Sequence, residues 1–509
     1  MACLLDLSGR ESALRPFPPR TLEDLQLDRL AAAMSFSDYY RLSPEELCSL
    51  FTDDAEVLRH RQAVFRDVLR FPELEDAMEA LLDSLDGWEG RSGARRGGAD
   101  SFAVGFSLED FGWLDSYLKR LDAAWQAFSR IPTESEGFRA LTALLDSIRT
   151  SPRFRDAEAD FRTLCGGFSA PAKLRLGYNL DGEMRPSRLK LLGMEPWTGD
   201  KRKKGARRQM MLTQLAMEMD AMLLQRVSAQ ASQDINAFVL RETAPLRGLR
   251  RDLIVCLSMK KYVKLLTDAR LPCAFPTLLP REEKGFRAKG LYDPLLLLNG
   301  TEQVVSNDAE FRPGGEILFL TGANQGGKTV FLLSVGLCQA LGQFGFPVPA
   351  AEAALSPAES ILTIFAPNGQ SYGRRGLLAE ETGRIAEAMA LVGEHSLLLF
   401  NEPLTSTGPE ETKAISAEVI AVCVAAGARG LWVTHVHELA ANRASLEEAL
   451  PWGSCLGSLR IVPEEAAGES RFTYLVERGE PLGRSFAHEA LRRGGVRLLE
   501  EAEDRAGPG

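Results

Sequence analysis

The stretch Thr321–Thr329 constrains the fold of this chain more than any other. It reads TGANQGGKT, it follows the apolar run Glu316–Leu320, and an apolar helical pattern continues to about Gln343. A strand, a G-x-x-x-x-G-K-T loop and a helix in this order predict a phosphate-binding loop, because the glycines let backbone N–H groups approach an anion closely. The start of the helix adds the positive end of its dipole. The sequence therefore predicts an α/β domain that binds a nucleoside triphosphate.

The residues of this loop divide into two roles. The Lys328 ammonium is expected to reach the β- and γ-phosphates, and the Thr329 hydroxyl is expected to bind Mg²⁺. ATP and Mg²⁺ are therefore the predicted ligands. The residues expected to surround the phosphates are Gly322, Ala323, Asn324, Gln325, Gly326, Gly327, Lys328 and Thr329.

The apolar run Ser396–Phe400 predicts a second strand, which ends in Asn401 and Glu402. In P-loop ATPases the matching strand usually ends in an Asp for Mg²⁺ and a Glu beside the attacking water. Asn401 keeps an acceptor oxygen but lacks the charge, so we expect it at the metal with weaker Mg²⁺ binding. Glu402 remains the candidate general base. ATP binding is therefore predicted, whereas ATPase activity is expected to be slow.

A third apolar run, Gly430–Thr434, ends in His435. The carboxyl end of a parallel strand faces the ligand crevice. His435 is therefore the second candidate catalytic residue, as a sensor of the γ-phosphate. We interpret His437, two residues further on, as a packing or surface residue.

Residues 1 to about 130 are predicted to be mostly helical. The stretch Thr21–Leu30 begins with a residue suited to cap a helix, and an acid stands at the third following position. Ser43 precedes Pro44, a second helix start. The first quarter of the chain therefore differs in character from the α/β domain.

A short β-rich element is expected between two long helices. Lys173–Leu180 alternates apolar and polar residues, Asp181-Gly182 favours a tight turn, and Arg188–Leu192 is a possible second strand. Helical patterns follow at about 207–241 and 249–268. This order suggests an insertion at the tip of a helical arm.

Basic residues gather at this element. Between Arg185 and Arg208 there are nine Lys or Arg residues and two acids. Such a local excess suits contacts with nucleic-acid phosphates, and a solvated loop without a partner is the alternative. The candidate nucleic-acid residues are Arg188, Lys190, Lys201, Arg202, Lys203 and Lys204.

Composition and net charge limit the partners and the cellular compartment that we expect. The net charge of −10 argues against attraction of the whole surface to nucleic acid, but leaves room for a local basic patch. Eight cysteines occur without a CxxC spacing, which favours reduced thiols. No signal peptide and no run of 18 apolar residues is visible. We therefore expect a cytoplasmic protein with no membrane segment.

Several motifs together resemble the MutS family of mismatch repair ATPases. The loop is similar to that family's TGPNMGGKST, with Asn324 and the glycine pair in matching places. Arg20–Leu27 and Arg59–Val64 are similar to the opening of its helical core domain. The other similar stretches are Phe346–Ala350, Phe400–Thr407, Val433–Leu439, Phe472–Val476 and Gly483–Ala487.

This resemblance implies a multidomain fold: an α-helical core with long lever helices and a small β-rich clamp, followed by an α/β P-loop NTPase domain of the ABC type. In the family, the ATPase domains dimerise and the clamps close around duplex DNA. A homodimer that binds double-stranded or branched DNA is therefore expected. The expected domains are a helical core at 1–134, lever helices at 135–250 with the clamp at about 166–206, a return to the core at 251–300, and the ATPase and dimerisation domain at 301–509.

Three departures from the family pattern qualify this expectation. The chain begins at the core domain, so we expect branched or distorted DNA rather than single mismatches to be sensed. Asn401 replaces the metal-binding Asp. The loop that supplies a Ser to the partner subunit's nucleotide reads Gly373–Glu380 here and has no Ser, which makes Arg374 or Arg375 a candidate contact in trans.

Three functions follow for testing. The first is an ATP-switched DNA-binding protein of the MutS type, acting in mismatch repair or as a DNA damage sensor. The second is a similar ATPase that acts on RNA or ribosomes. The third is a nucleotide-gated scaffold with little hydrolysis, which Asn401 motivates.

Overall fold

A computed structural model gives the structure of most of the chain. All structural statements below concern the residues it describes. These are 4–6, 16–94, 108–152, 155, 172–180, 186–196, 246, 248–301, 303–323, 325–366, 376–450, 456–466 and 469–481.

The chain divides into two compact units. The first contains residues 1–8 and 66–253, and the second contains residues 9–65 and 254–509. Two of the three boundaries between the units fall inside helices, α4 (Ala55–Arg70) and α10 (Leu249–Asp268). The helix expected at about 249–268 is thereby confirmed. The predicted domain limits at residues 134, 250 and 300 stay a prediction.

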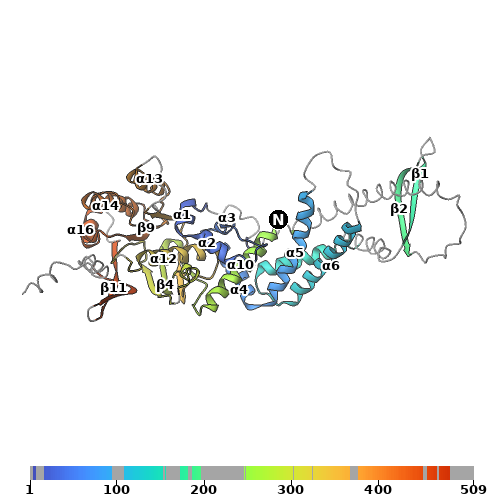
Figure 1. Ribbon diagram of the computed structural model, residues 1–509, viewed down its shortest axis with the longest axis horizontal. Coiled ribbons are helices and arrows are strands. Elements are labelled where there is room, and N and C mark those ends of the chain that lie inside the picture. The colour runs from blue at the N-terminus through green and yellow to red at the C-terminus, as the bar shows by residue number, and fades with distance from the viewer. Residues whose placement is uncertain are drawn as a thin grey trace, which may run out of the picture. The chain divides into compact units, whose positions relative to one another are not determined.

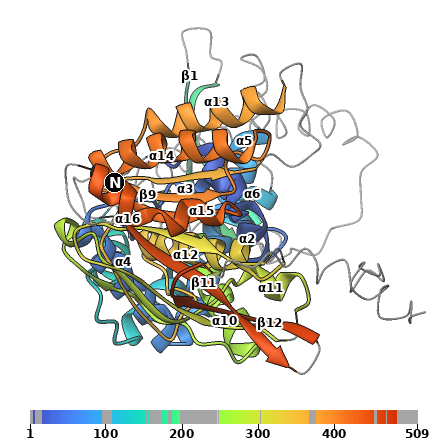
Figure 2. The same ribbon diagram turned by 90° about the vertical axis from the view of Figure 1, so that its left-hand side faces the viewer.

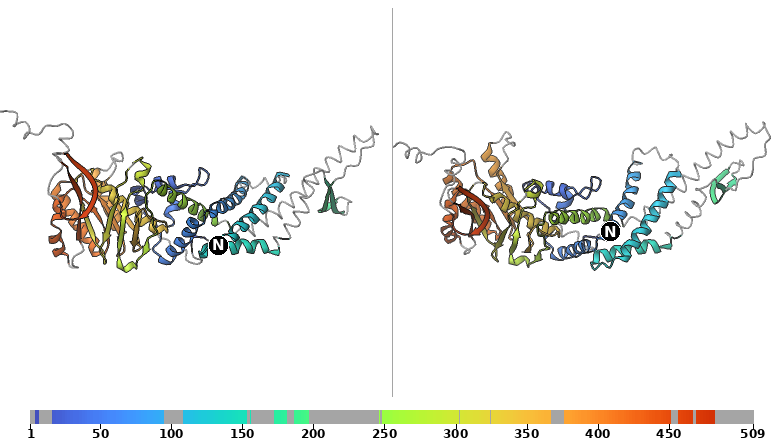
Figure 3. Two further views of the ribbon diagram at one scale, coloured as in Figure 1. Left: turned by 90° about the horizontal axis from the view of Figure 1, so that it is seen from below. Right: turned by 60° about the horizontal axis from the view of Figure 1, so that its bottom comes forward.

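The long helices that the structure describes in the first unit include α5 (Glu73–Ala94), α6 (Leu108–Arg130) and α7 (Glu136–Thr150). Helix α6 packs against both α5 and α7 (Figure 3). The buried carboxylate of Asp67 accepts a hydrogen bond of 2.8 Å from the backbone N–H of Ser135, which caps α7. Polar anchors of this kind satisfy the backbone at the start of the helix.

The expected β-hairpin is present in the first unit. Strand β1 (Ala172–Leu180) pairs antiparallel with β2 (Pro186–Pro196), and the register runs from Ala172 opposite Pro196 to Leu180 opposite Pro186 (Figure 1). Arg188 and Lys190 lie on β2. Lys201, Arg202, Lys203, Lys204 and the helical pattern at 207–241 lie outside the described residues.

The second unit is built on a six-stranded sheet in the order β12-β11-β6-β10-β9-β8. The three strands predicted from apolar runs are confirmed, and β8 and β11 extend the parallel part of the sheet. Strand β12 is antiparallel to β11. The strands are β6 (Ile317–Thr321), β8 (Ile361–Phe365), β9 (Leu397–Asn401), β10 (Arg429–Val433), β11 (Leu456–Ala466) and β12 (Glu469–Arg478).

Helices cover both faces of this sheet (Figure 2). On one face, Phe319, Phe400 and Trp432 form a core with side chains of the covering helices, and the Phe400 and Trp432 rings stack at 4.3 Å. Helix α12 covers the opposite face, where a Cβ at its Gly336 would lie 2.7 Å from Cδ1 of Leu399. Leu399 is next to Phe400 on β9, and successive residues of a strand point to opposite faces. The covering helices of the first face are α13 (Leu377–Met389), α14 (Pro409–Ala425), α15 (His437–Ala441) and α16 (Arg443–Ala449).

Helix α12 (Lys328–Phe344) follows the predicted loop and is buried from Phe331 to its end. It begins after Gly327 and ends before Gly345, and both glycines have left-handed backbone angles, with φ of 94° and 90°. Glycine adopts such angles without steric cost. The loop and the helix are thus confined to the segment where the sequence predicts them.

A second sheet of four strands lies in the same unit, in the order β3-β7-β4-β5. Its strands are β3 (Thr277–Leu278), β4 (Phe286–Leu291), β5 (Asn307–Phe311) and β7 (Glu352–Leu355), and the short helix α11 (Leu295–Leu298) stands between β4 and β5. No sequence pattern above predicts this sheet. It matters for function because β5 brings Asn307 to the cavity described below.

The N-terminal helices α1 (Pro19–Asp24), α2 (Leu27–Met34) and α3 (Pro44–Cys48) belong to the second unit. The expected helix over Thr21–Leu30 is wrong in detail, since the chain breaks at Gln26 with a φ of 52°. Thr21 does not cap a helix. Its hydroxyl donates instead to the Ile361 carbonyl at 2.8 Å, so a tertiary contact replaces the local one. The helix start at Ser43 is confirmed by a complete capping box.

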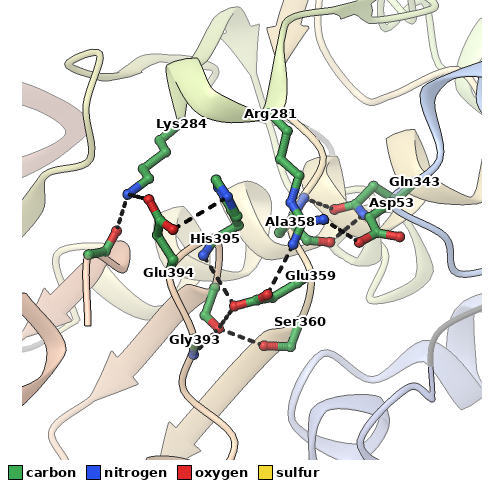
Figure 4. A network of polar contacts seen from close by, with 12 residues as sticks. Asp53, Arg281, Lys284, Gln343, Ala358, Glu359, Ser360, Gly393, Glu394 and His395 are labelled. Carbon is green, nitrogen blue, oxygen red and sulfur yellow. Dashed lines mark hydrogen bonds and ion pairs between the residues drawn. The ribbon is translucent and has the colours of Figure 1, made fainter.

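Polar contacts join this N-terminal segment to the sheet domain. Gln343, at the end of α12, donates to the Thr52 carbonyl at 2.8 Å. Arg281 lies between Asp53, at 2.9 Å, and Glu359, at 3.0 Å (Figure 4). Asp53 is largely buried, and Arg281 places an opposite charge beside its carboxylate. Within the described residues, no helix is long and apolar enough to cross a membrane.

Candidate nucleotide site

The loop between β6 and α12 has the backbone of a phosphate cradle. Gly322 has a φ of 148°, and a Cβ atom at this position would lie 2.7 Å from Cγ1 of Ile461 on β11. Gly327 precedes the first residue of α12 in a left-handed conformation. The free N–H groups at the start of a helix are suited to bind an anion. A side chain at Gly322 would disturb this cradle.

Lys328 lies inside the loop rather than in solvent, with a side chain that is only 6% exposed. Its ammonium donates to the carbonyl oxygens of Gly322 at 3.0 Å and of Ala323 at 3.3 Å. The Glu402 carboxylate lies 3.7 Å away. Burial lowers the pKa of Lys328, and the charge of Glu402 opposes this shift. The structure therefore holds a cation where phosphate oxygens would meet it.

Thr329 and Asn401 lie in direct contact. The Thr329 hydroxyl donates to Oδ1 of Asn401 at 3.3 Å. Magnesium prefers oxygen ligands and keeps several waters and phosphate oxygens in its shell. Two adjacent neutral oxygens, one on the exposed Thr329, fit that need but supply no charge. The described residues contain no cluster of three or more His, Cys, Asp or Glu side chains suited to a metal.

Glu402 follows β9 in a left-handed backbone conformation, with a φ of 50°. Its N–H donates to the Val433 carbonyl at 3.0 Å, which ties it to the end of β10. A positive φ is uncommon for a residue with a side chain, and such strain persists only where surrounding contacts hold it. The carboxylate faces Lys328. The sequence-predicted residues of β9 and the loop are thus brought together.

The two histidines after β10 lie in different environments. His435 is exposed, whereas His437 is half-buried, and no hydrogen-bond partner for its buried Nδ1 is found among the described residues. Burial lowers the pKa of His437, and the charges of Lys328 and His435 lower it further. We interpreted His437 from the sequence as a packing or surface residue. Its electrostatic coupling to Lys328 adds a link to the site that the sequence did not predict.

A cavity of about 550 Å³ opens beside the loop. This volume lies in the range of small-molecule sites. Its polar lining includes Lys328, Thr329, Asn401 and Glu402, and its apolar lining includes Leu296, Val305 and Tyr474. A nucleotide combines a charged phosphate chain with an aromatic base whose flat faces pack on apolar side chains, so the lining suits both parts. No histidine is among the described residues that line it.

Tyr474 on β12 is a lining residue that the sequence did not single out. It has a φ of 58°, and its Cδ1 would lie 3.2 Å from a Cβ on Gly327. Asn307 holds the bend, because its Nδ2 donates to the Tyr474 carbonyl at 3.1 Å and its Oδ1 accepts from the Val476 N–H at 2.7 Å. The aromatic ring is thereby held at the phosphate loop. The only sequence feature that could have pointed to this residue was an aromatic side chain on the last strand of the domain, β12.

Some predicted site residues cannot be placed. Asn324, Arg374 and Arg375 lie outside the described residues. The same holds for the four basic residues of 201–204, as stated above. Their assigned roles stay predictions.

The sheet, the cradle and the contact between Thr329 and Asn401 define a P-loop nucleotide-binding domain of the α/β class. Residues 318–487 match the family model described as MutS domain V. The C-terminal part of the chain is therefore a MutS domain V ATPase, and MutS and MutS2 proteins are its distant relatives.

These relatives match only part of the chain. An endonuclease MutS2 of Solidesulfovibrio magneticus is 31% identical over 215 residues, 41% of this chain and 28% of the relative. An endonuclease MutS2 of Anaeromyxobacter is 34% identical over 164 residues, 31% of this chain and 20% of the relative. A DNA mismatch repair protein MutS of Thermosynechococcus vestitus is 31% identical over 196 residues, 38% of this chain and 21% of the relative. The matched segments thus span less than a third of each relative.

Proposed function

We propose that this chain is an ATP-dependent DNA-binding protein of the MutS type, in which nucleotide binding by a homodimer switches its grip on mismatched or branched DNA. One observation carries the proposal. Lys328, the Thr329–Asn401 pair and Glu402 converge on one cavity within a MutS domain V.

The residues of the cavity have distinct parts in binding and hydrolysis. The loop N–H groups and Lys328 bind the phosphates, and Thr329 and Asn401 supply oxygens toward Mg²⁺. Magnesium, when bound, neutralises phosphate charge. Glu402 orients the attacking water and accepts its proton. His435 follows β10 as an exposed residue outside the described lining of the cavity, so its contact with the γ-phosphate stays a prediction.

The DNA part of the proposal rests on the hairpin and on the relatives. Strand β2 carries Arg188 and Lys190, within the basic stretch that continues to Arg208. A relative named a DNA mismatch repair protein supports DNA as the polymer. Lysine and arginine contacts with phosphates carry no sequence information, so they suit recognition of DNA shape.

The test is a binding titration of the full chain with homoduplex, mismatched and four-way-junction DNA, each with and without ATP and Mg²⁺. We expect ATP to change the affinity for at least one of these DNAs. An unchanged affinity for all three would contradict the proposal. An RNA of equal length serves as the competitor, and a preference for it would replace DNA by RNA as the partner.

Matched variants sharpen this test. Log affinity falls as log salt concentration rises, and in the double variant Arg188→Ala/Lys190→Ala this dependence should be weaker. The magnitude of the slope should decrease by about 2, one for each lost phosphate contact. The control is Arg130→Ala/Arg139→Ala, which removes two exposed arginines of α6 and α7. Equal slopes for the two double variants would remove the hairpin from the interface.

A nucleotide-gated scaffold with little hydrolysis is the second candidate, because Asn401 supplies no charge next to Thr329. It predicts ATP binding and an ATP-dependent change in DNA affinity without turnover on the time scale of the switch. In the first candidate, by contrast, Arg374 or Arg375 contacts phosphate in trans as an arginine finger that speeds hydrolysis. Alanine at both positions should leave monomer binding intact and abolish any dimer-dependent turnover.

A further inference from the structure

Glu381 on α13 is a buried carboxylate that does not line the nucleotide cavity. The residue is 1% exposed. Its Oε1 accepts from the N–H of Thr405 at 3.0 Å and from the Thr405 hydroxyl at 2.6 Å. Its Oε2 accepts from the N–H of Ser406 at 3.3 Å and from the Ser406 hydroxyl. Four donors from two adjacent residues thus converge on one side chain.

These contacts keep Glu381 charged. Burial raises the pKa of this carboxyl, but the hydrogen bonds donated by Ser406 and Thr405 outweigh burial and hold the pKa below its ordinary value. Hydrogen bonds to a charged acceptor are stronger than neutral ones. The carboxylate therefore anchors the backbone and the side chains of both residues.

The anchored segment is the loop that begins with Glu402. Thr405 and Ser406 stand three and four residues after Glu402, between β9 and α14. Glu402 itself is tied by its N–H to Val433. Between these two attachments, Leu404 is buried in the core of the sheet face. The path from Glu402 to Ser406 is therefore held at three successive points.

The far end of this loop is fastened from α14. The hydroxyl groups of Thr407 and Thr412 lie 2.6 Å apart, and the Thr412 hydroxyl donates to the Leu404 carbonyl at 3.4 Å. These contacts are local to the loop and its own helix. Glu381 differs, because it comes from α13, an element that precedes β9 in the chain.

Helix α13 is itself attached to the sheet near the same edge. Arg384 donates to the carbonyl of Phe365, the last residue of β8, at 3.0 Å. Its other nitrogen pairs with Glu380 at 3.1 Å. Glu381 therefore transmits the position of a helix docked on β8 to the loop after β9.

We propose that Glu381 is a positioning residue for ATP hydrolysis, which holds Thr405 and Ser406 so that Glu402 keeps its strained backbone and its place opposite Lys328. This inference rests on the proposed ATPase function. Loss of Glu381 lowers the rate of hydrolysis while nucleotide affinity stays, because the hydrogen bonds from Lys328 to Gly322 and Ala323 do not involve Glu381. A merely structural role would lower stability without separating hydrolysis from binding.

The experiment compares Glu381→Ala, Glu381→Gln and Ser406→Ala with the wild-type full chain. Single-turnover hydrolysis with excess protein measures even slow chemistry, and titration with a fluorescent ATP analogue measures affinity. The matched control is Glu387→Gln, the same change on the same helix at an exposed residue that pairs with Arg20 at 2.6 Å. Thermal melting reports the folding of each variant.

We expect Glu381→Ala to lower the single-turnover rate about 10- to 100-fold, the scale of a misplaced catalytic group. Nucleotide affinity should stay within about twofold, which is less than 0.5 kcal/mol. Glu381→Gln retains an acceptor and should recover part of the rate. The Glu381→Ala/Ser406→Ala double variant should be no slower than Glu381→Ala, because Glu381→Ala already removes the hydrogen bond that Ser406→Ala breaks.

An unchanged rate in both Glu381 variants would overturn the inference while leaving the proposed function intact. Equal losses of rate and affinity would overturn it as well. A wild-type chain that binds the analogue without hydrolysis would instead contradict both the ATPase function and the inference. If Glu381→Ala does not fold, Glu381→Gln and Ser406→Ala decide the outcome, and wild-type rates in both would count against the positioning role.

Discussion

The phosphate loop and the loop that begins with Glu402 lie on the same cavity but are held in different ways. The carbonyl oxygens of Gly322 and Ala323, which accept hydrogen bonds from the Lys328 ammonium, belong to its own loop. Glu402 and the residues after it depend on Val433 and on Glu381, which lie far from them in the chain. The first loop thus combines local hydrogen bonds with packing on distant strands, whereas hydrogen bonds from distant residues hold the second.

We therefore expect that different substitutions alter nucleotide binding and hydrolysis. Changes in the phosphate loop should act first on nucleotide affinity. Changes around Glu402 should act first on the chemical step. The largest changes are therefore expected at Glu402 and Lys328, and smaller ones at Asn401 and Glu381.

Glu402→Gln should have the largest effect. The amide cannot accept the proton of the attacking water, so hydrolysis should fall about 10²- to 10⁴-fold. ATP affinity should stay or rise, because the glutamine removes a negative charge 3.7 Å from Lys328 and close to the phosphates. Single-turnover assays and nucleotide titration measure both. Glu418→Gln on α14, an exposed change, is the control, and a parallel loss of affinity would break the separation.

Lys328→Ala should weaken ATP binding about 10- to 100-fold, the size of a lost hydrogen bond to a charged group. Equilibrium titration with a fluorescent ATP analogue measures this loss. The matched control is Lys289→Ala, which removes an exposed lysine paired with Glu352 at 2.9 Å on the smaller sheet. Equal affinities of Lys328→Ala and the control would exclude the loop as the phosphate site.

Asn401→Asp should shift the Mg²⁺ dependence rather than ATP affinity itself. A carboxylate beside Thr329 adds charge at the metal, so half-maximal activity should need about tenfold less Mg²⁺. A Mg²⁺ titration of hydrolysis at fixed ATP measures the shift. Faster turnover at saturating Mg²⁺ would further show that the native asparagine slows the site. An unchanged Mg²⁺ requirement would place the metal elsewhere.

Glu381→Gln should reduce stability by about 1–3 kcal/mol at neutral pH, the cost of weakening hydrogen bonds to a buried anion. Because the pKa of Glu381 is lowered from 4.5 in the folded chain, its contribution is complete above pH 4.5 and is lost as the pH falls through the folded value. Melting temperatures of wild type and variant should therefore converge in acid. A constant gap across pH would argue against an anionic anchor.

Much of the nucleotide domain was predictable because its signals are local. The conformation of the loop Gly322–Thr329 could be predicted because Gly322 and Gly327 stand where the backbone has a positive φ. The apolar runs before Asn401 and His435 appear as strands β9 and β10 within about one residue of their predicted limits. The hairpin of β1 and β2 also followed from alternation and a turn.

Other parts were not predictable, because distant contacts decide them. The break at Gln26 and the hydrogen bond from Thr21 to Ile361 arise where the N-terminal helices pack on the sheet domain. Asn307 and Tyr474 lie on strands of two different sheets, β5 and β12. They meet because the two sheets approach each other at the cavity.

A phosphate loop, the strands around it and the missing charge at Asn401 can be inferred from the sequence, since each depends on residues close together in the chain. The carboxylate that anchors the loop after Glu402, and the histidine on which the charge of Lys328 acts, emerge only from the folded chain. Buried hydrogen bonds and burial-dependent charges depend on which residues pack nearby, and a local pattern does not contain that information.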